Sequence, residues 1–260
     1  MSKIKMIVTD LDGTLLTSGK YISASTKRVL SFLKEQGILF VIATARPIRT
    51  VTPIFTDVTY DAGIFHNGAV ILEENQNIMN IGVTKPYEML SHILTDQPEC
   101  HVAVEVEDHL YANFDAERLW PGVGYTTTSK FFEVQGKVAD KLIIEVDSLE
   151  RMSNYEKYLT KELYLQLSEN KIAMVLNREA TKIKAVEKIA SRYGIQMEEI
   201  VAFGDDYNDI DMITGCGIGV AMDNALEEVK GAADEVCDTN DQDGIAKWIE
   251  QNILMGGQPL

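Results

Sequence analysis

The sequence predicts an α/β fold with a parallel sheet, helices on both faces of that sheet, and a second α/β domain inserted into the first. Short apolar segments alternate with amphipathic segments in the first part of the chain and again after residue 182. Between them, over roughly residues 84–176, apolar and polar residues alternate within strands, which is typical of a sheet with one wet face. We therefore predict a discontinuous core of residues 1–83 and 177–260 around an inserted domain of residues 84–176.

Strand and helix segments follow one another in the first part of the predicted core. Ile4–Thr9 is short, apolar and bounded by an aspartate, so it predicts a buried strand. Ser23 is a suitable N-cap for the helix that follows, and Gly37 is a suitable stop. The same pattern continues as a strand at Ile38–Ala43, a helix with Pro47 at its first position, a strand at Ala62–Phe65 and an extended segment at Ala69–Leu72.

The remaining segments complete the two domains. In the last part of the core we predict a helix over Lys182–Tyr193 ended by Gly194, strands at Ile200–Phe203 and Ile218–Met222, a polar loop from Gly204 to Asp209, and a helix over Gly244–Ile253. In the insert we predict helices near Pro86–Thr95 and Leu149–Lys161, strands at His101–Glu107, His109–Asn113, Lys141–Val146 and Ile172–Val175, and a loop from Pro121 to Ser129.

Charge and composition exclude several classes of protein. The 260 residues include 24 Lys and Arg against 40 Asp and Glu, a net charge of −16, so a nucleic-acid or anionic-membrane binder is disfavoured. The three cysteines have no metal-binding spacing, and neither a signal peptide nor a membrane span is visible, so we expect a cytoplasmic protein. It would be a monomer or a small homo-oligomer that binds no nucleic acid and no membrane.

Polar residues gather at the ends of the predicted parallel strands, where ligands bind in such sheets. Asp10 and Asp12 follow the first strand, Thr44 follows the second, and Asp205 follows a later one. Two neighbouring carboxylates cost stability unless a cation or a proton lies between them. A third carboxylate from Asp205 would complete a set of oxygen donors of the kind that Mg²⁺ prefers. The alternative to a metal site is that Asp10 and Asp12, in an isolated Asp-x-Asp-Gly segment, are turn and helix-cap residues.

Four segments carry a resemblance to the haloacid dehalogenase superfamily. Asp10-Leu11-Asp12-Gly13-Thr14-Leu15-Leu16 resembles its first motif, Thr44 its second, Lys182 its third, and Gly204-Asp205-Asp206-Tyr207-Asn208-Asp209 its fourth. Asn67-Gly68-Ala69, Ala221-Met222-Asp223-Asn224-Ala225 and Asp243-Gly244-Ile245 further resemble the Cof-type phosphatase branch. The resemblance implies a Rossmann-like core with an inserted α/β cap domain, and Thr44 and Lys182 stand 138 positions apart, which leaves room for such a cap.

Two positions depart from the pattern of that branch. Ala45 stands where the branch usually has Gly, and Ile183 follows Lys182 where Gly is common. If position 45 requires a positive φ, Ala45 would be strained. If it requires only a free backbone N–H, alanine meets that requirement as well as glycine does. Neither departure removes a reacting group.

The resemblance also implies a role for each site residue. Asp10 would be the nucleophile that forms an aspartyl-phosphate, and Asp12 would be the general acid and then the general base. Asp209 would orient Lys182 or a metal-bound water. The Mg²⁺ ion would be held by Asp10, Asp205 and the backbone carbonyl of Asp12, and the phosphate by Thr44, Lys182, Asn208 and the N–H groups of Leu11 and Ala45.

These assignments predict a Mg²⁺-dependent phosphatase that acts on a small phosphorylated metabolite such as a sugar phosphate. A phosphosugar mutase on the same scaffold and a non-catalytic phosphometabolite-binding protein are the alternatives. Arg46 is expected to pair with a carboxylate rather than with the phosphate, and Asp206 to face solvent. Residues 84–176 would set the substrate specificity, and their sequence carries no pattern that identifies the substrate.

Overall fold

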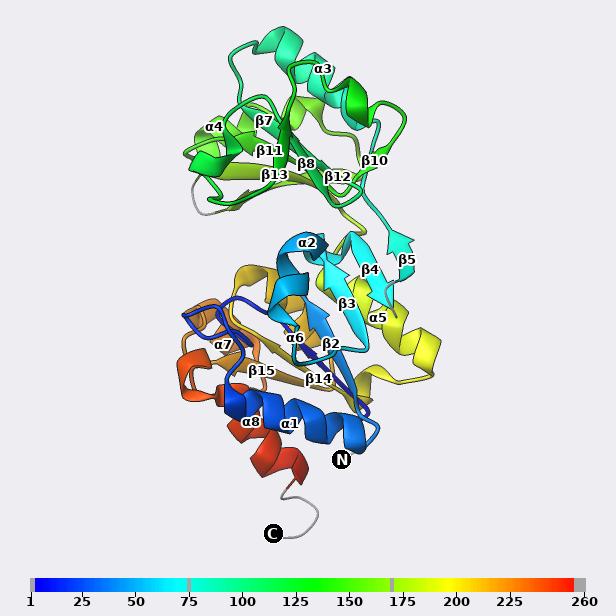
Figure 1. The fold of residues 1–260 in the computed structure, drawn as a ribbon, viewed down its shortest axis with the longest axis vertical. Coiled ribbons are helices and arrows are strands. Elements are labelled where there is room, and N and C mark those ends of the chain that lie inside the picture. Colours follow the sequence, from blue (N-terminus) through cyan, green and yellow to red (C-terminus); the bar gives the residue numbers. More distant parts are fainter. Residues whose placement is uncertain (1–2, 74–75, 169–170, 255–260) are drawn as a thin grey trace. The chain divides into compact units, whose positions relative to one another are not determined.

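The computed structural model describes residues 3–73, 76–168 and 171–254. These residues form two compact units, which are drawn in Figure 1. Unit 1 consists of Met1–Ile78 and Thr181–Leu260, and unit 2 of Met79–Ala180, against a predicted insert of residues 84–176. The ends of the predicted core, residues 1–2 and 255–260, lie outside the described residues. No helix within the described ranges is long and apolar enough to cross a membrane.

A twisted, mainly parallel sheet forms the centre of unit 1. Its strands are β1 (Met6–Thr9), β2 (Leu39–Ala43), β3 (Ala62–Phe65), β4 (Val70–Glu73), β5 (Gln76–Asn80), β14 (Ile200–Gly204), β15 (Ile218–Met222) and β16 (Glu235–Cys237). They are hydrogen-bonded in the order β16-β15-β14-β1-β2-β3-β4-β5. The pairs from β16 to β3 are parallel, and β4 returns antiparallel to β3. Strands β1 and β14 are buried along their whole length, as continuous apolar runs predict.

Helices cover both faces of this sheet (Figure 1). Helices α1 (Ala24–Glu35) and α8 (Gly244–Ile249) pack together on one face. On the other face α6 (Ile210–Gly215) packs between α5 (Lys182–Tyr193) and α7 (Glu227–Ala232). Ser23 caps α1, since its side chain accepts a hydrogen bond from the N–H of Thr26. A parallel sheet covered on both faces is the fold class that the sequence predicts.

Two predicted elements of unit 1 differ in the structure, and four short elements are not predicted. Pro47 is the N-cap of α2 (Ile48–Val51) rather than its first residue, and α2 passes at once into a 3₁₀ turn over Thr52–Ile54. The final helix is regular only to Ile249, and a π-helical turn follows over Glu250–Leu254. The elements β5, β16, α6 and α7 are not predicted from the sequence, because elements this short carry too little periodicity to be recognised.

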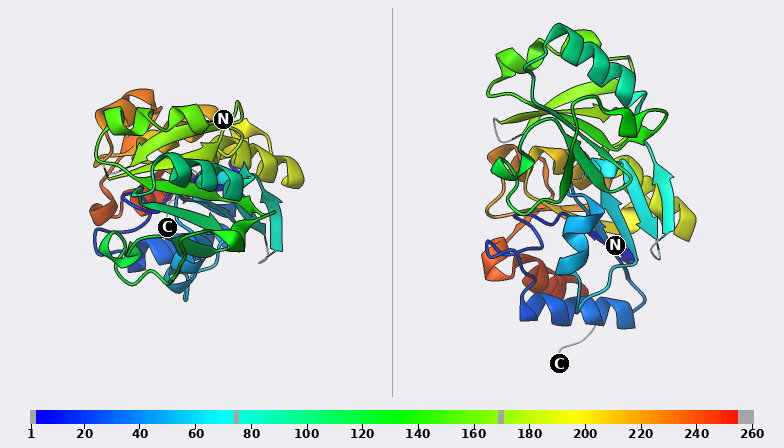
Figure 2. Two further views of the ribbon diagram at one scale, coloured as in Figure 1. Left: turned by 90° about the horizontal axis from the view of Figure 1, so that it is seen from above. Right: turned by 45° about the horizontal axis from the view of Figure 1, so that its top comes forward.

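Unit 2 is a mostly antiparallel sheet with helices on one face (Figures 1 and 2). The sheet runs in the order β12 (Leu163–Ser168), β13 (Ile172–Asn177), β11 (Lys141–Glu145), β7 (Val102–Val106), β8 (His109–Ala112) and β9 (Tyr125–Thr127). Helix α3 (Pro86–Asp96) and residues from α4 (Leu149–Ser153) share one apolar cluster with this sheet. A short ladder joins β6 (Val83–Thr84) to β10 (Val138–Ala139).

Three predictions for the insert are wrong in part. The helix expected over Leu149–Lys161 ends at Ser153 and is followed by a 3₁₀ turn, Glu156–Tyr158. Strand β9 lies within the segment predicted to be a loop, and β12 lies where the sequence predicts no strand. Strand β7 has no wet face, because Val104 packs in the helix-side cluster and Ala103 in a second cluster around Phe114. The alternation of apolar and polar residues does not reveal that the second face of β7 is also covered, because alanine occurs on both buried and exposed faces.

Burial of β7 on both faces leaves charged groups inside unit 2. Glu105, Asp140 and Lys141 are 4, 2 and 9% exposed. Asn80 Nδ2 donates to Asp140 Oδ1 at 3.2 Å. Burial, assisted by the neighbouring charge of Glu105, raises the pKa of Asp140 to about 6. The ionised form of Asp140 is therefore disfavoured in the folded protein.

Asp140→Asn is expected to stabilise the protein at pH 8 by about 1–2 kcal/mol, since a shift of one pKa unit corresponds to ~1.4 kcal/mol. The native carboxyl holds its proton from pH 4 to pH 6, where the unfolded chain has lost it, so its contribution to stability falls as the pH rises through that window. Denaturant unfolding at pH 4 and pH 8 measures the effect, with the exposed Asp147→Asn as control. An equal stability of wild type and Asp140→Asn at pH 8 would contradict the prediction.

Candidate active site

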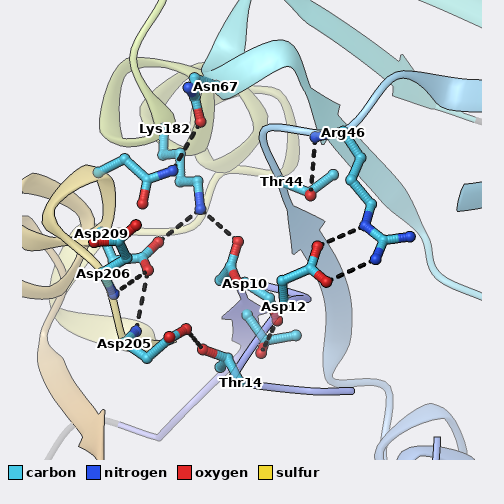
Figure 3. Close-up of polar contacts among 12 residues, drawn as sticks. Asp10, Asp12, Thr14, Thr44, Arg46, Asn67, Lys182, Asp205, Asp206 and Asp209 are labelled. Atoms are coloured by element: carbon cyan, nitrogen blue, oxygen red, sulfur yellow. Dashed lines mark hydrogen bonds and ion pairs between the residues drawn. The ribbon is translucent and has the colours of Figure 1, made fainter. Parts of the chain in front are cut away.

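The predicted site residues of unit 1 meet at one edge of its sheet (Figure 3). Asp10 follows β1, Thr44 follows β2 and Asp205 follows β14, and these three strands are neighbours. The chain proceeds from β1 towards β3 on one side and from β14 towards β16 on the other, so the strand order reverses between β1 and β14. A crevice at such a reversal is where parallel sheets bind their ligands.

Lys182 links two carboxylates at the centre of this edge. Its Nζ donates to Asp10 Oδ1 at 2.6 Å and to Asp209 Oδ1 at 2.7 Å (Figure 3). The side chains of Lys182 and Asp209 are 1 and 0% exposed. Burial opposes the charge on Lys182, but the two carboxylates outweigh it and raise the pKa of this ammonium group above its usual range. Lys182 is therefore a permanent cation in the site.

The position of Lys182 is set by the start of α5. Thr181 is the N-cap of that helix. Gly68, in the turn after β3, has φ +109°, and a Cβ on it would collide with the backbone of Thr181. Only glycine therefore allows this turn and the helix start to approach each other so closely. Ile183 follows within regular helix, so its replacement of the common Gly does not disturb the start of α5.

Asp209 also organises the loop after β14. Its Oδ2 accepts hydrogen bonds from the N–H groups of Asp205 and Asp206, both at 3.1 Å. The two oxygens of Asp209 are thus directed at Lys182 and at the loop backbone. The Asp206 side chain is exposed and accepts from the N–H of Tyr207, as a cap residue does.

Asp205 is held against the loop after β1. Thr14 Oγ1 donates to Asp205 Oδ1 at 2.5 Å. Gly13 has φ +79°, and a Cβ at this position would collide with the Asp205 carboxylate, so only glycine fits. Burial, together with the charge of Asp209, raises the pKa of Asp205 to about 6 even though the hydrogen bond from Thr14 lowers it.

The carboxylates outnumber the cations in the centre of the site. Asp10, Asp205 and Asp209 each offer an oxygen within 4.8 Å of the other two, and Lys182 is the cation buried among them. Burial and the charges of Asp209 and Asp205 raise the pKa of Asp10 despite its contact with Lys182. Within the described residues, the second oxygens of Asp10 and Asp205 accept no side-chain hydrogen bond. A divalent cation fits this donor set, because it would supply the missing positive charge.

Asp12 has different partners from the other carboxylates. Arg46 donates to both of its oxygens, with Nε to Oδ2 at 2.5 Å and the terminal nitrogen to Oδ1 at 2.6 Å (Figure 3). Lys20 Nζ also donates to Oδ1, at 2.6 Å. Burial would raise the pKa of Asp12, but these hydrogen bonds from Arg46 and Lys20 hold it below its ordinary value. The Asp12 carboxylate thus lies outside the group that could hold a metal.

The remaining predicted residues surround the same edge. Thr44 is buried, and its Oγ1 accepts from the N–H of Arg46 at 3.1 Å, so its own proton can be donated elsewhere. Ala45 does not have a positive φ, which explains why alanine is tolerated at a position where the Cof-type phosphatase branch usually has glycine. Leu11 is fully buried beside Asp10. Asn208 Nδ2 donates to Asn67 Oδ1 at 2.9 Å, which joins the loop after β14 to the turn after β3.

Three residues that contact the site receive no role from the sequence: Lys20, Thr14 and Asn67. Thr14 and Asn67 stand in segments that carry the resemblance, so the motifs themselves contained the signal. Lys20 stands in no motif, and a lone lysine eight residues beyond Asp12 gives no sign that the chain turns back there.

Comparison with known proteins finds similar sequences and structures over nearly the whole chain. A sequence profile of the haloacid dehalogenase-like hydrolases matches residues 7–249. A protein of Haemophilus influenzae is 32% identical over 260 residues, covering 96% of this chain and 98% of its own length. The 5-amino-6-(5-phospho-D-ribitylamino)uracil phosphatase YcsE of Bacillus subtilis is 30% identical and covers 96% of each chain. The structure of the subclass IIB sugar phosphatase BT4131 superposes with a TM-score of 0.82 at 25% identity, over 95% of this chain and 98% of the other.

Proposed function

The chain belongs to the haloacid dehalogenase-like hydrolases, and from this membership we propose that it is a Mg²⁺-dependent phosphatase of a small phosphorylated metabolite, with a sugar phosphate as the substrate class. The observation that carries the proposal is the meeting of Asp10, Asp12, Thr44, Lys182 and Asp205 at one sheet edge. Buried like charges at such an edge have no stability rationale without a ligand.

Asp10 is the nucleophile in this proposal. One oxygen of its carboxylate attacks phosphorus, and the bond from phosphorus to the ester oxygen breaks, which leaves a phosphoryl group on Asp10. Asp12 gives a proton to the departing oxygen, so the product leaves as an alcohol rather than an alkoxide. Lys182 offsets the negative charge on the phosphoryl oxygens, and the Thr44 hydroxyl donates a hydrogen bond to one of them.

Hydrolysis of the aspartyl-phosphate completes the cycle. Asp12, now ionised, takes a proton from a water molecule, and that water attacks phosphorus. The bond from phosphorus to the Asp10 oxygen breaks, so inorganic phosphate leaves and the carboxylate is restored. Asp209 holds Lys182 in place through both steps, because its contact with Nζ does not involve the reacting oxygens.

Asp10 and Asp205, with the backbone carbonyl of Asp12, are the groups that would hold Mg²⁺. The bound ion would supply charge stabilisation at the phosphate oxygens and reduce the repulsion between that phosphate and the carboxylates. Its positive charge would also offset the electrostatic repulsion between a chain of net charge −16 and an anionic substrate.

The activity test is phosphate release from 4-nitrophenyl phosphate and from a panel of sugar monophosphates, with Mg²⁺ and with a chelator. Chelation is expected to reduce turnover by at least about 100-fold, because a catalytic metal contributes several kcal/mol to the transition state. Added Mg²⁺ should restore the rate. Turnover that is unchanged by the chelator would contradict the proposal.

The same panel separates the two alternative functions. A mutase would interconvert sugar monophosphates without releasing phosphate. A binding protein would bind them without converting them. Release of phosphate from at least one member of the panel supports the phosphatase.

A further inference from the structure

Asn224 connects three segments of unit 1. It lies in the loop after β15, within residues 221–225, a segment that has no part in the proposed mechanism. Its Nδ2 donates to the carbonyl of Gly13 at 2.8 Å, and its Oδ1 accepts from the backbone N–H of Asn240 at 3.0 Å. A backbone carbonyl can only accept and a backbone N–H can only donate, so these two partners fix the orientation of the amide group. One side chain thus joins the loop after β15 to the loop after β1 and to the 3₁₀ turn Asn240–Gln242.

The backbone at Gly13 needs an anchor because the residue there has to be glycine. Its φ of +79°, and the collision that a Cβ would make with the Asp205 carboxylate, exclude other residues. The same absence of a side chain gives the glycine backbone more freedom of rotation than any other residue has. A rotation at Gly13 would displace Thr14, which follows it in the chain. The hydrogen bond from Asn224 to the Gly13 carbonyl opposes this rotation.

Thr14 carries this constraint to Asp205. Thr14 is 1% exposed, and its Oγ1 donates to Asp205 Oδ1 at 2.5 Å (Figure 3). The loop after β15 also holds the backbone of Asp205, because the N–H of Leu226 donates to the Asp205 carbonyl at 3.1 Å. Asp205 is one of the three acids whose oxygens lie within 4.8 Å of one another. The loop that carries Asn224 therefore helps to set the spacing of the oxygens that a cation would bind.

We propose that Asn224 is a positioning residue for the Mg²⁺ site, which fixes Gly13 and so holds the Thr14 hydroxyl against Asp205. The inference rests on the proposed phosphatase function, because that function requires the ion. Asn224 offers no ligand atom to the site, since its amide oxygen is directed at Asn240 and its amide nitrogen at Gly13. Its effect is to order the loop after β1 before the ion binds, so that binding does not have to supply that order.

Mg²⁺ binding to Asn224→Ala tests this role without any measurement of turnover. Isothermal titration calorimetry with Mg²⁺ gives the Kd of the ion for wild type and for the variant. We expect Kd to rise at least about 10-fold in Asn224→Ala, since loss of a residue that orients the ligands of a metal typically costs ~10–100-fold in affinity. Asn224 is exposed, so the substitution leaves the core unchanged and the variant should fold.

Asn240→Ala is the matched control. Asn240 Nδ2 donates to the carbonyl of Leu16, also at 2.8 Å, so this variant likewise removes an amide hydrogen bond to the loop after β1. The backbone N–H that binds Asn224 remains. Kd for Mg²⁺ should rise less than about threefold, because the large costs in metal affinity belong to residues that orient the ligands. A general loosening of the loop would instead weaken Mg²⁺ binding equally in both variants.

A double variant tests the route through Thr14. Thr14→Val removes the hydroxyl that binds Asp205 and keeps nearly the same volume. In the presence of Thr14→Val, Asn224→Ala should raise Kd by less than about a further threefold, since the effects of residues that act in one network are not additive.

The role of Asn224 would be overturned by any of three results: an equal Kd in wild type and Asn224→Ala, equal rises in Asn224→Ala and Asn240→Ala, or additive rises in the double variant. None of these results touches the proposed function as long as wild type binds Mg²⁺ and releases phosphate. Wild type that binds no Mg²⁺ would contradict the proposed function, and the inference with it.

Discussion

Asp10→Asn is expected to abolish phosphate release, with kcat/KM reduced by at least about 10³-fold, because an amide cannot form the aspartyl-phosphate and nucleophile removal has costs of this order or larger. The fold should be unaffected or slightly more stable. Asp10 is 7% exposed, and burial beside two other carboxylates disfavours its charge, so a neutral side chain removes a repulsion that the folded state bears. Loss of activity without loss of stability distinguishes a reacting group from a structural one.

The control for Asp10→Asn is Asp206→Asn. Asp206 lies in the loop after β14 close to the other acids, but its side chain is exposed and accepts the N–H of Tyr207, which asparagine can also do. Its turnover should equal that of wild type. Acid quenching of wild type during turnover should yield a peptide containing Asp10 with one added phosphoryl group, and Asp10→Asn should yield none. More than a tenth of the wild-type rate in Asp10→Asn would exclude Asp10 as the nucleophile.

The sequence predicts the sheet edge well because two physical rules act together. Buried parallel strands are continuous apolar runs, and the polar residue that ends each run lies at the same edge as its neighbours. Asp10, Thr44 and Asp205 are found by these rules alone. Lys182 needs the family resemblance as well, since a lysine at the start of a helix carries no signal of its own.

The environment of Asp12 shows what the sequence does not contain. The sequence predicts that Arg46 pairs with a carboxylate, but which carboxylate it is depends on how the loop after β2 meets the loop after β1. Lys20 depends on a turn closed by backbone hydrogen bonds and anchored to Asp241, far away in the chain. Contacts of this kind are set by tertiary structure rather than by periodicity. The burial of β7 on both faces is not predictable for a similar reason, because the residues that cover its second face follow no regular pattern.

Lys182→Met is expected to destabilise the protein by about 3–5 kcal/mol in the presence of a chelator, because removing one partner of a buried ion pair leaves the other charge uncompensated. Here two carboxylates, those of Asp10 and Asp209, lose the same cation. Methionine fills nearly the volume of the lysine stem, so the cost measures charge rather than a cavity. Denaturant unfolding reports the change, and Lys27→Met at the exposed pair with Asp57 should stay within about 0.5 kcal/mol of wild type.

A double variant tests whether charge is the cause. If the uncompensated carboxylates are responsible, Lys182→Met should cost at least about 1 kcal/mol less when Asp10→Asn is already present, since contacting residues of one network are coupled by ~0.5–3 kcal/mol. Added Mg²⁺ should stabilise Lys182→Met more than it stabilises wild type, because an ion held by Asp10 and Asp205 would compensate part of the negative charge that Lys182 neutralises in wild type. Additive costs together with an equal response to Mg²⁺ would mean that Lys182 stabilises the site by packing alone. In that case the balance of charge would not be what holds this sheet edge together.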